Sequence, residues 1–141
     1  MSDKTFVDTN VFVYAIDDAE PAKRDRAQSV LISDEYGEFV VSSQVLGEFY
    51  VTVTRKLGGR VSATEAEEGL DRLYRHPVVP VDATLVRNAI KISRSSHISY
   101  WDGLVVAAAA RAGCERLLSE DLNDGQVIGS VCIENPFRDV T

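Results

Sequence analysis

Short apolar runs alternate along this chain with longer segments in which apolar residues recur at helical spacing. This alternation favours an α/β fold with a parallel sheet, because consecutive parallel strands need a connection of helix length between them. Five runs have the length and the residue types of strands: Thr5-Phe6-Val7, Phe39-Val40-Val41, Val78–Val81, Leu117-Leu118 and Val131-Cys132-Ile133. We therefore expect five strands in a sheet that helices cover.

Capping residues and glycines mark the helices expected between these runs. The expected helices cover residues 21–33, a segment capped by Ser43 that ends at Gly58-Gly59, residues 62–75, a segment capped by Asp82, and Ser99 to the residue before Gly113. The 141 residues carry no repeat or linker and are enough to bury a hydrophobic core. We expect a single domain over residues 1–141.

Composition limits the location and the redox chemistry of the chain. Cys114 and Cys132 lie in apolar stretches without metal-ligand spacing, so we expect buried, reduced thiols. The longest apolar run, Gly103 to Ala110, is far shorter than the ~20 residues that span a membrane. Asp8 and Asn10 interrupt the first apolar stretch, which argues against a signal peptide. These features predict a cytoplasmic protein that does not associate with membranes.

The formal net charge of −7 argues at first against a nucleic-acid partner, because phosphate binding favours basic surfaces. A chain that binds a divalent cation through several of its acids is an exception. The bound ion offsets the charge of those carboxylates, and the rest of the chain is then only mildly acidic. The position of the acids along the chain therefore becomes the main question.

Four acids stand where the expected fold gathers a site, since ligands of open parallel sheets bind beyond the carboxyl ends of the strands. Asp8 ends the first strand, and Asp121 follows the fourth. Glu48 lies in the helix after the second strand, and Asp102 lies at the start of the Ala-rich helix. Mg²⁺ prefers oxygen ligands and is commonly held by a few carboxylates together with substrate phosphate. The sequence therefore predicts a site for Mg²⁺ or Mn²⁺.

Each of these acids also has a purely structural interpretation. Asp8 suits a turn or a helix N-cap, and Glu48 suits a solvated helix face. Ser99 and Asp102 have the spacing of a capping box, and ordinary turn chemistry explains Asp121. No single acid is decisive, and the signal is that four of them are expected at the same edge of the sheet.

Four ordered motifs resemble those of PIN-domain nucleases, most closely the VapC-type ribonuclease toxins of toxin–antitoxin pairs. They are Phe6-Val7-Asp8-Thr9-Asn10, Ser43 to Glu48, Tyr100-Trp101-Asp102-Gly103 and Ser119-Glu120-Asp121. The resemblance covers essentially the whole chain, although Gly103 stands where the family more often has Ala. It implies a three-layer α/β/α sandwich with a five-stranded parallel sheet, usually in a homodimer.

The resemblance also implies a function and the residues that perform it. It implies an RNA-cleaving enzyme that uses Mg²⁺ or Mn²⁺ and is paired with a cognate antitoxin. The implied catalytic and metal-binding residues are Asp8, Glu48, Asp102 and Asp121. The implied supporting residues are Asn10, Ser119 and Asp124.

Basic and aromatic residues suggest how RNA is held. Arg87, Lys91 and Arg94 recur at i, i+4 and i+7 on one expected helix, a stripe suited to phosphates. Tyr100 and Trp101 are candidates to stack an unpaired base beside Asp102. A second basic cluster consists of Arg55, Lys56 and Arg60. A solvated helix face and simple packing of Trp101 are the structural alternatives.

Three other functions stay open at this point. A free-standing RNA-processing nuclease would have the same fold and the same acids. A non-catalytic binding domain would not need the four acids intact. An aspartyl phosphotransfer enzyme is disfavoured, because Asn10 stands where an Asp-x-Asp motif needs its second acid and no Lys follows the last expected strand.

Overall fold

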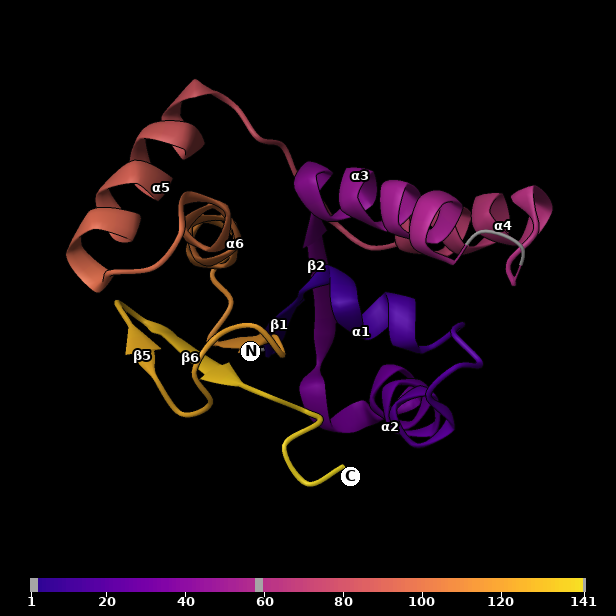
Figure 1. Ribbon diagram of the computed structural model, residues 1–141. Helices are drawn as coiled ribbons and strands as arrows, with labels where there is room; N and C mark the ends of the chain where they lie inside the picture. The colour runs from indigo at the N-terminus through magenta and orange to yellow at the C-terminus, as the bar shows by residue number, and fades with distance from the viewer. Residues whose placement is uncertain (1–2, 58–59, 141) are drawn as a thin grey trace.

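The structure is a computed structural model that describes residues 3–57 and 60–140 (Figure 1). The strands are β1 (Lys4–Val7), β2 (Glu38–Ser42), β3 (Val78–Val79), β4 (Arg116–Leu118), β5 (Val127–Ile128) and β6 (Val131–Glu134). The α-helices are α1 (Thr9–Tyr14), α2 (Pro21–Ile32), α3 (Ser43–Val51), α4 (Ala63–Leu73), α5 (Ala83–Ser96) and α6 (Tyr100–Arg111). A 3₁₀ turn, η1 (Asp34–Tyr36), precedes β2, and a π-helical segment, η2 (Thr52–Lys56), extends α3. The helix end expected at Gly58-Gly59 lies outside the described residues.

The described strands form one sheet in the order β3-β2-β1-β4-β6-β5, and the first five of these are parallel. The α/β class is confirmed, but the sheet has six strands in the described ranges, not five. The additional strand, β5, is only two residues long and runs antiparallel to β6. Gly129 and Ser130 join the two strands, and Gly129 has a φ of 60°, which glycine adopts without strain.

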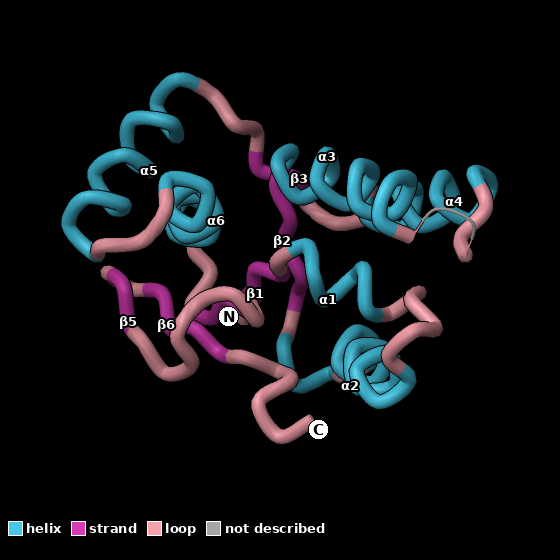
Figure 2. Tube along the Cα trace, viewed as in Figure 1, coloured by secondary structure: helices cyan, strands magenta, loops and turns pink. Residues whose placement is uncertain are grey.

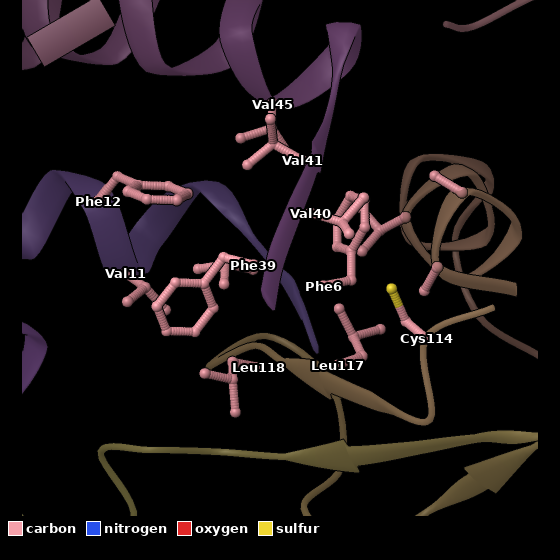
Figure 3. Close-up of a cluster of buried hydrophobic side chains, with 14 of the residues drawn as sticks. Phe6, Val11, Phe12, Phe39, Val40, Val41, Val45, Cys114, Leu117 and Leu118 are labelled. Carbon is pink, nitrogen blue, oxygen red and sulfur yellow. The ribbon is translucent and has the colours of Figure 1, made fainter. Parts of the chain in front are cut away.

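Helices cover both faces of the sheet (Figures 1 and 2). The helices α5 and α6 lie on one side, and α1 to α4 lie on the other. Figure 3 shows Val40 pointing towards α6, while Phe39 and Val41 point towards α1. All three side chains are buried. Burial of both faces explains why the strands are continuous apolar runs and do not alternate with polar residues.

The connections to the two neighbours of β1 run over opposite faces of the sheet. The chain leaves β1 through α1 and α2 to reach β2, whereas it enters β4 through α5 and α6 on the opposite face. The strands β1 and β4 are nevertheless neighbours, with Val7 paired to Leu118. In open α/β sheets, ligands bind outside the carboxyl ends of the strands where the connections switch faces in this way. The residues that follow Val7 and Leu118 are therefore placed where a site is expected.

Serine caps fix the start of two helices that reach this edge. Ser42 caps α3, because its Oγ accepts a hydrogen bond of 3.3 Å from the amide of Val45. The expectation that Ser43 is the cap is wrong: Ser43 already lies in the first helical turn, whereas Ser42 keeps the extended backbone that a cap requires. Ser99 caps α6 as expected, with its Oγ accepting from the amide of Asp102 at 3.0 Å.

The helices α5 and α6 approach each other closely at Gly103. A Cβ atom at this position would lie 2.6 Å from the carbonyl oxygen of Ala89 in α5. Even an alanine would therefore push the two helices apart. This contact requires glycine at position 103, where the resemblance led us to expect alanine, and it fixes the position of the neighbouring Asp102.

Two expectations drawn from composition concern membranes and thiols. In the described ranges, no helix is both long and apolar enough to traverse a bilayer. Cys114 is buried, while Cys132 is only partly buried, and both are free thiols.

Candidate active site at the carboxyl edge of the sheet

Asp8 is a buried carboxylate held between β1 and β4. It follows β1 directly and caps α1, with its Oδ1 accepting from the amide of Thr9 at 2.8 Å. Its Oδ2 accepts from the hydroxyl of Ser119, which follows β4, at 2.9 Å. The side chain of Asp8 thus caps α1 and is also hydrogen-bonded to the residue that follows β4.

Glu48 reaches the same place from α3. The helix starts at the carboxyl end of β2, and its second turn carries Glu48. The exposed Oε1 of Glu48 accepts from the hydroxyl of Thr9 at 3.0 Å. Because Thr9 also donates its amide to Asp8, one residue connects the two carboxylates.

Asp102 and Asp121 complete the set of four predicted acids. Asp102 is partly buried in the first turn of α6, and Asp121 is exposed two residues after Ser119. The amide of Asp121 donates to the hydroxyl of Ser119 at 3.2 Å. All four acids line one open cleft of about 420 Å³. We call it the acidic cleft, because six acids line it: Asp8, Asp17, Glu48, Asp102, Glu120 and Asp121.

Burial and mutual repulsion raise the pKa of two of these acids. The pKa of Asp8 rises from 3.8 to about 7, chiefly because burial removes the carboxylate from water. The hydrogen bonds from Thr9 and Ser119 lower this pKa, while the negative charges of Glu48 and Asp121 raise it. Burial also raises the pKa of Asp121, and the charge of Asp102 adds to that effect. The cleft therefore favours a positive charge, either a proton or a cation.

Two side-chain amides in the cleft have oxygens that lack a partner. In the described part of the chain, the buried Oδ1 of Asn10 and the buried Oε1 of Gln44 accept no hydrogen bond. Such oxygens are costly to bury unless a ligand or a cation satisfies them. Gln44 was not among the predicted site residues, although it precedes Glu48 by four residues and therefore shares its helix face. Its Nε2 donates to the carbonyl of Trp101 at 3.2 Å.

A hydrogen-bonded triad closes one side of the cleft. Glu120 accepts from the hydroxyl of Tyr14 and from the ammonium of Lys23, both at 2.7 Å. The ammonium of Lys23 also lies 4.8 Å from the centre of the Tyr14 ring. Both carboxylate oxygens of Glu120 are occupied, so it ties the loop after β4 to α1 and α2. Sequence reasoning missed this triad, because its members are distant in the chain and fit no local motif.

The other predicted residues divide into those at the cleft and those away from it. Asn10 and Trp101 line the cleft, and Trp101 is 63% exposed. Tyr100 instead packs against the hydrophobic core. Asp124 lies outside the cleft, because its oxygens accept from the amide of Asn135 and from the guanidinium of Arg138. The basic residues of α5 are exposed and are also absent from the cleft lining: Arg87, Lys91 and Arg94.

The four carboxylates line the same cleft, but their side chains do not converge on a single point. Within the described residues, no three His, Cys, Asp or Glu side chains are arranged to hold a metal ion. The composition of the cleft nevertheless fits a hard divalent cation, which takes carboxylate and amide oxygens as ligands. The unpartnered oxygens of Asn10 and Gln44 and the raised pKa of Asp8 agree with this donor set.

Several solved structures have the same fold as this chain. A toxin–antitoxin complex from Klebsiella pneumoniae has a TM-score of 0.69 at 14% identity and covers 94% of this chain and 97% of its own. VapC20 of Mycobacterium tuberculosis, a toxin that cleaves the sarcin–ricin loop, has a TM-score of 0.64 at 22% identity and covers 80% and 86%. FitAB bound to a DNA fragment has a TM-score of 0.70 at 20% identity and covers 95% and 96%. These likenesses show that the chain has the same fold as these structures.

Sequence comparison identifies the family. Residues 5–123 match the PIN domain, and the chain belongs to the PIN domain family. A comparison with curated proteins gave no significant match.

Proposed function

We propose that this chain is an endoribonuclease that depends on Mg²⁺ or Mn²⁺ and hydrolyses RNA phosphodiester bonds. One observation carries the proposal: four carboxylates from four separate segments line a single cleft at the carboxyl edge of the sheet. A stable fold has no need to gather like charges in this way, and clustered acids with perturbed pKa values are typical of functional sites. The proposal treats residues 1–141 as one catalytic domain that acts on RNA in the cytoplasm.

Asp8, Glu48, Asp102 and Asp121 would hold the ion, with amide oxygens of Asn10 and Gln44 as further ligands or as contacts to bound water. When bound, the ion supplies positive charge that stabilises the negative charge developing on the phosphate during cleavage. Asp8 is fixed by its hydrogen bonds to Thr9 and Ser119. Glu48 and Asp121 are exposed, and their negative charges act on Asp8.

An RNA cleavage assay tests this function. We expect the purified chain to cut RNA with Mg²⁺ or Mn²⁺ and to stop when EDTA is added. Asp8→Asn or Asp102→Asn should lower the rate at least ~100-fold, because charge stabilisation in the transition state is lost. Asp124→Asn is the matched control, since Asp124 lies outside the cleft and should leave the rate unchanged. Full activity in EDTA would refute metal dependence.

The biological role that we propose is that of a toxin in a toxin–antitoxin pair, supported by the likeness in fold to a toxin–antitoxin complex and to the toxin VapC20. Induced expression should arrest growth of a bacterial host, and expression of the Asp8→Asn form should not. An active nuclease that leaves growth unaffected would favour an RNA-processing enzyme. Equal harm from both forms would point to a nonspecific effect of expression.

An apolar groove of about 320 Å³ is the proposed seat for the antitoxin. Its lining includes Phe12, Phe39 and Leu73, together with Ile32, which is 84% exposed. Arg72 and Arg75 also line it, so the groove suits an apolar segment that carries acidic side chains. We expect a cognate antitoxin to bind the chain, and Ile32→Asp to weaken that binding without changing cleavage. Unchanged binding would exclude this groove.

We also propose that the chain forms a homodimer, as the family resemblance implies. Sedimentation of the purified chain would measure its oligomeric state directly. A monomer at micromolar concentration would contradict this part of the proposal.

A further inference from the structure

One face of α3 and η2 forms a helical wall of the acidic cleft. Gln44, Glu48, Thr52 and Lys56 all line it, and they follow one another at intervals of four residues along α3 and η2. Trp101 lies at the Gln44 end, where its carbonyl accepts from the Gln44 amide. Lys56 lies at the opposite end of this wall, roughly 18 Å from Gln44 along a helix.

The π-helical segment η2 explains how Lys56 comes to face the cleft. Four residues exceed one turn of an α-helix, so side chains at this interval rotate by roughly 40° at each step. Over three steps, a regular helix would carry the last side chain away from the cleft. A π-helical turn contains more residues than an α-helical turn, so each residue rotates less about the axis. The segment Thr52–Lys56 therefore brings the side chain of Lys56 back towards the cleft. Segments of this kind are frequent at functional sites.

Among the described residues that line the cleft, Lys56 is the one basic residue, and six are acidic. Its side chain is exposed, and no ion pair in the described ranges involves it. The nearby cations differ in this respect. Lys23 is paired with Glu120, and Arg60 is paired with Asp17. Arg55 belongs to the same π-helical segment but does not line the cleft.

We propose that Lys56 is a substrate-binding residue whose ammonium holds a phosphate of the RNA that flanks the bond being cut. The acids of the cleft repel the other phosphates of the strand, and a cation at the end of the wall offsets that repulsion. Lys56 lies two helical turns beyond Glu48, so it is assigned to a flanking phosphate and not to the scissile one. This inference rests on the proposed ribonuclease function and adds the residue that holds the strand.

Steady-state cleavage of a single-stranded RNA oligonucleotide tests this role through Lys56→Gln. At 0.1 M salt, one lost phosphate contact on a single strand corresponds to about a fivefold weaker interaction. We expect KM to rise by about that factor with kcat unchanged, and the slope of log KM against log salt to fall by about 0.7. Arg55→Gln is the matched control and should leave both values as in the wild type. Lys56→Arg should restore KM.

A binding measurement separates this inference from the proposed function. Anisotropy of the same labelled RNA, with Ca²⁺ in place of Mg²⁺, should show the same loss for Lys56→Gln. Equal effects of Lys56→Gln and Arg55→Gln would mean that only the overall charge matters, and the inference would be wrong. It would also be wrong if the wild type cleaves RNA and Lys56→Gln does so with the same KM. A wild type that neither binds nor cleaves RNA would overturn both this inference and the proposed function.

Discussion

The hydroxyl of Ser119 donates to Oδ2 of Asp8 across 2.9 Å and joins the carboxyl ends of β1 and β4. The same Ser119 oxygen accepts from the amide of Asp121 at 3.2 Å. One buried hydroxyl therefore orients the most buried acid of the cleft and positions the loop that carries another. The hydrogen bond also lowers the pKa of Asp8, which burial raises to about 7.

The pH dependence of the chain follows from the raised pKa of Asp8. Between pH 3.8 and about 7, the folded chain binds a proton at Asp8 that the unfolded chain has released. The contribution of Asp8 to the free energy of unfolding is thus greatest at low pH, and it is lost as the pH rises to about 7. A metal ion must displace this proton, so we expect cleavage to decline below a midpoint that moves down by about one pH unit for each tenfold increase in Mn²⁺.

Ser119→Ala tests the cause of that pH dependence. Without the hydroxyl, the pKa of Asp8 should rise further, and the midpoint of the pH–rate profile should move to higher pH at fixed Mn²⁺. Ser62→Ala is the control, because it removes the cap of α4 without touching the cleft. A profile that moves equally in both variants would show that lost stability is responsible, and not the hydrogen bond.

Asp121→Asn is expected to stabilise the metal-free chain while it abolishes cleavage. Burial is the main cause of the raised pKa of Asp121, and the negative charges of Asp102 and Glu120 raise it further. Removing one exposed charge should raise the free energy of unfolding by about 1 kcal/mol at most, which is roughly 3 °C in Tm in EDTA. Added Mn²⁺ should raise the Tm of the wild type more than that of the variant.

Asp71→Asn is the control for these thermal melts, since Asp71 is exposed on α4 and away from the cleft. It should change neither the Tm in EDTA nor the response to Mn²⁺. If Asp121→Asn melts below the wild type in EDTA and responds to Mn²⁺ equally, Asp121 is a structural turn residue.

Gly103→Ala should destabilise the chain, because the new Cβ would lie 2.6 Å from the Ala89 carbonyl and force α5 and α6 apart. Overpacking of this kind typically lowers the free energy of unfolding by about 1–3 kcal/mol. Gly47→Ala on α3 is the matched control, since its Cβ would meet no atom within 4 Å. It should stabilise the helix by up to ~1 kcal/mol. Urea denaturation of both variants gives the comparison, and a neutral Gly103→Ala would contradict the close packing of α5 and α6.

The sequence was sufficient to predict the α/β class and most element positions, because buried strands and amphipathic helices carry strong local patterns. It was not sufficient for short elements. The six residues of α1 follow a strand and carry Val11, Phe12 and Val13, so they match no clear helical period. The two-residue strand β5 depends on pairing with β6, which no local pattern reveals.

The strand-end rule placed Asp8 and Asp121 at one edge of the sheet before the structure was known. The family resemblance also suggested Asp124 as a supporting residue, but Asn135 and Arg138 hold its carboxylate outside the cleft. The contacts of Asp124 reach the segment after β6, and the contacts of Glu120 reach α1 and α2 near the start of the chain. Hydrogen bonds of this kind are set by tertiary packing, and the sequence gives no local signal for them.

The basic stripe of α5 yields a prediction about binding that does not depend on the cleft. Replacing Arg87, Lys91 and Arg94 by Gln should weaken RNA binding and lower its salt slope by roughly one unit per lost contact. These residues lie outside the cleft lining, so kcat should stay unchanged. Binding measured over a range of salt concentrations is the test. A slope equal to that of the wild type would show that the stripe is only a solvated helix face.

Mn²⁺ binding is the most direct test of the central claim that the acidic cleft is a metal site. The signal of free Mn²⁺ in electron paramagnetic resonance measures the ions bound at equilibrium. We expect the wild type to bind at least one Mn²⁺ per chain, Asp8→Asn to bind at least ~10-fold more weakly, and Asp71→Asn to bind as the wild type does. A wild type that leaves the free Mn²⁺ signal unchanged, or an Asp8→Asn variant that binds equally well, would contradict the account.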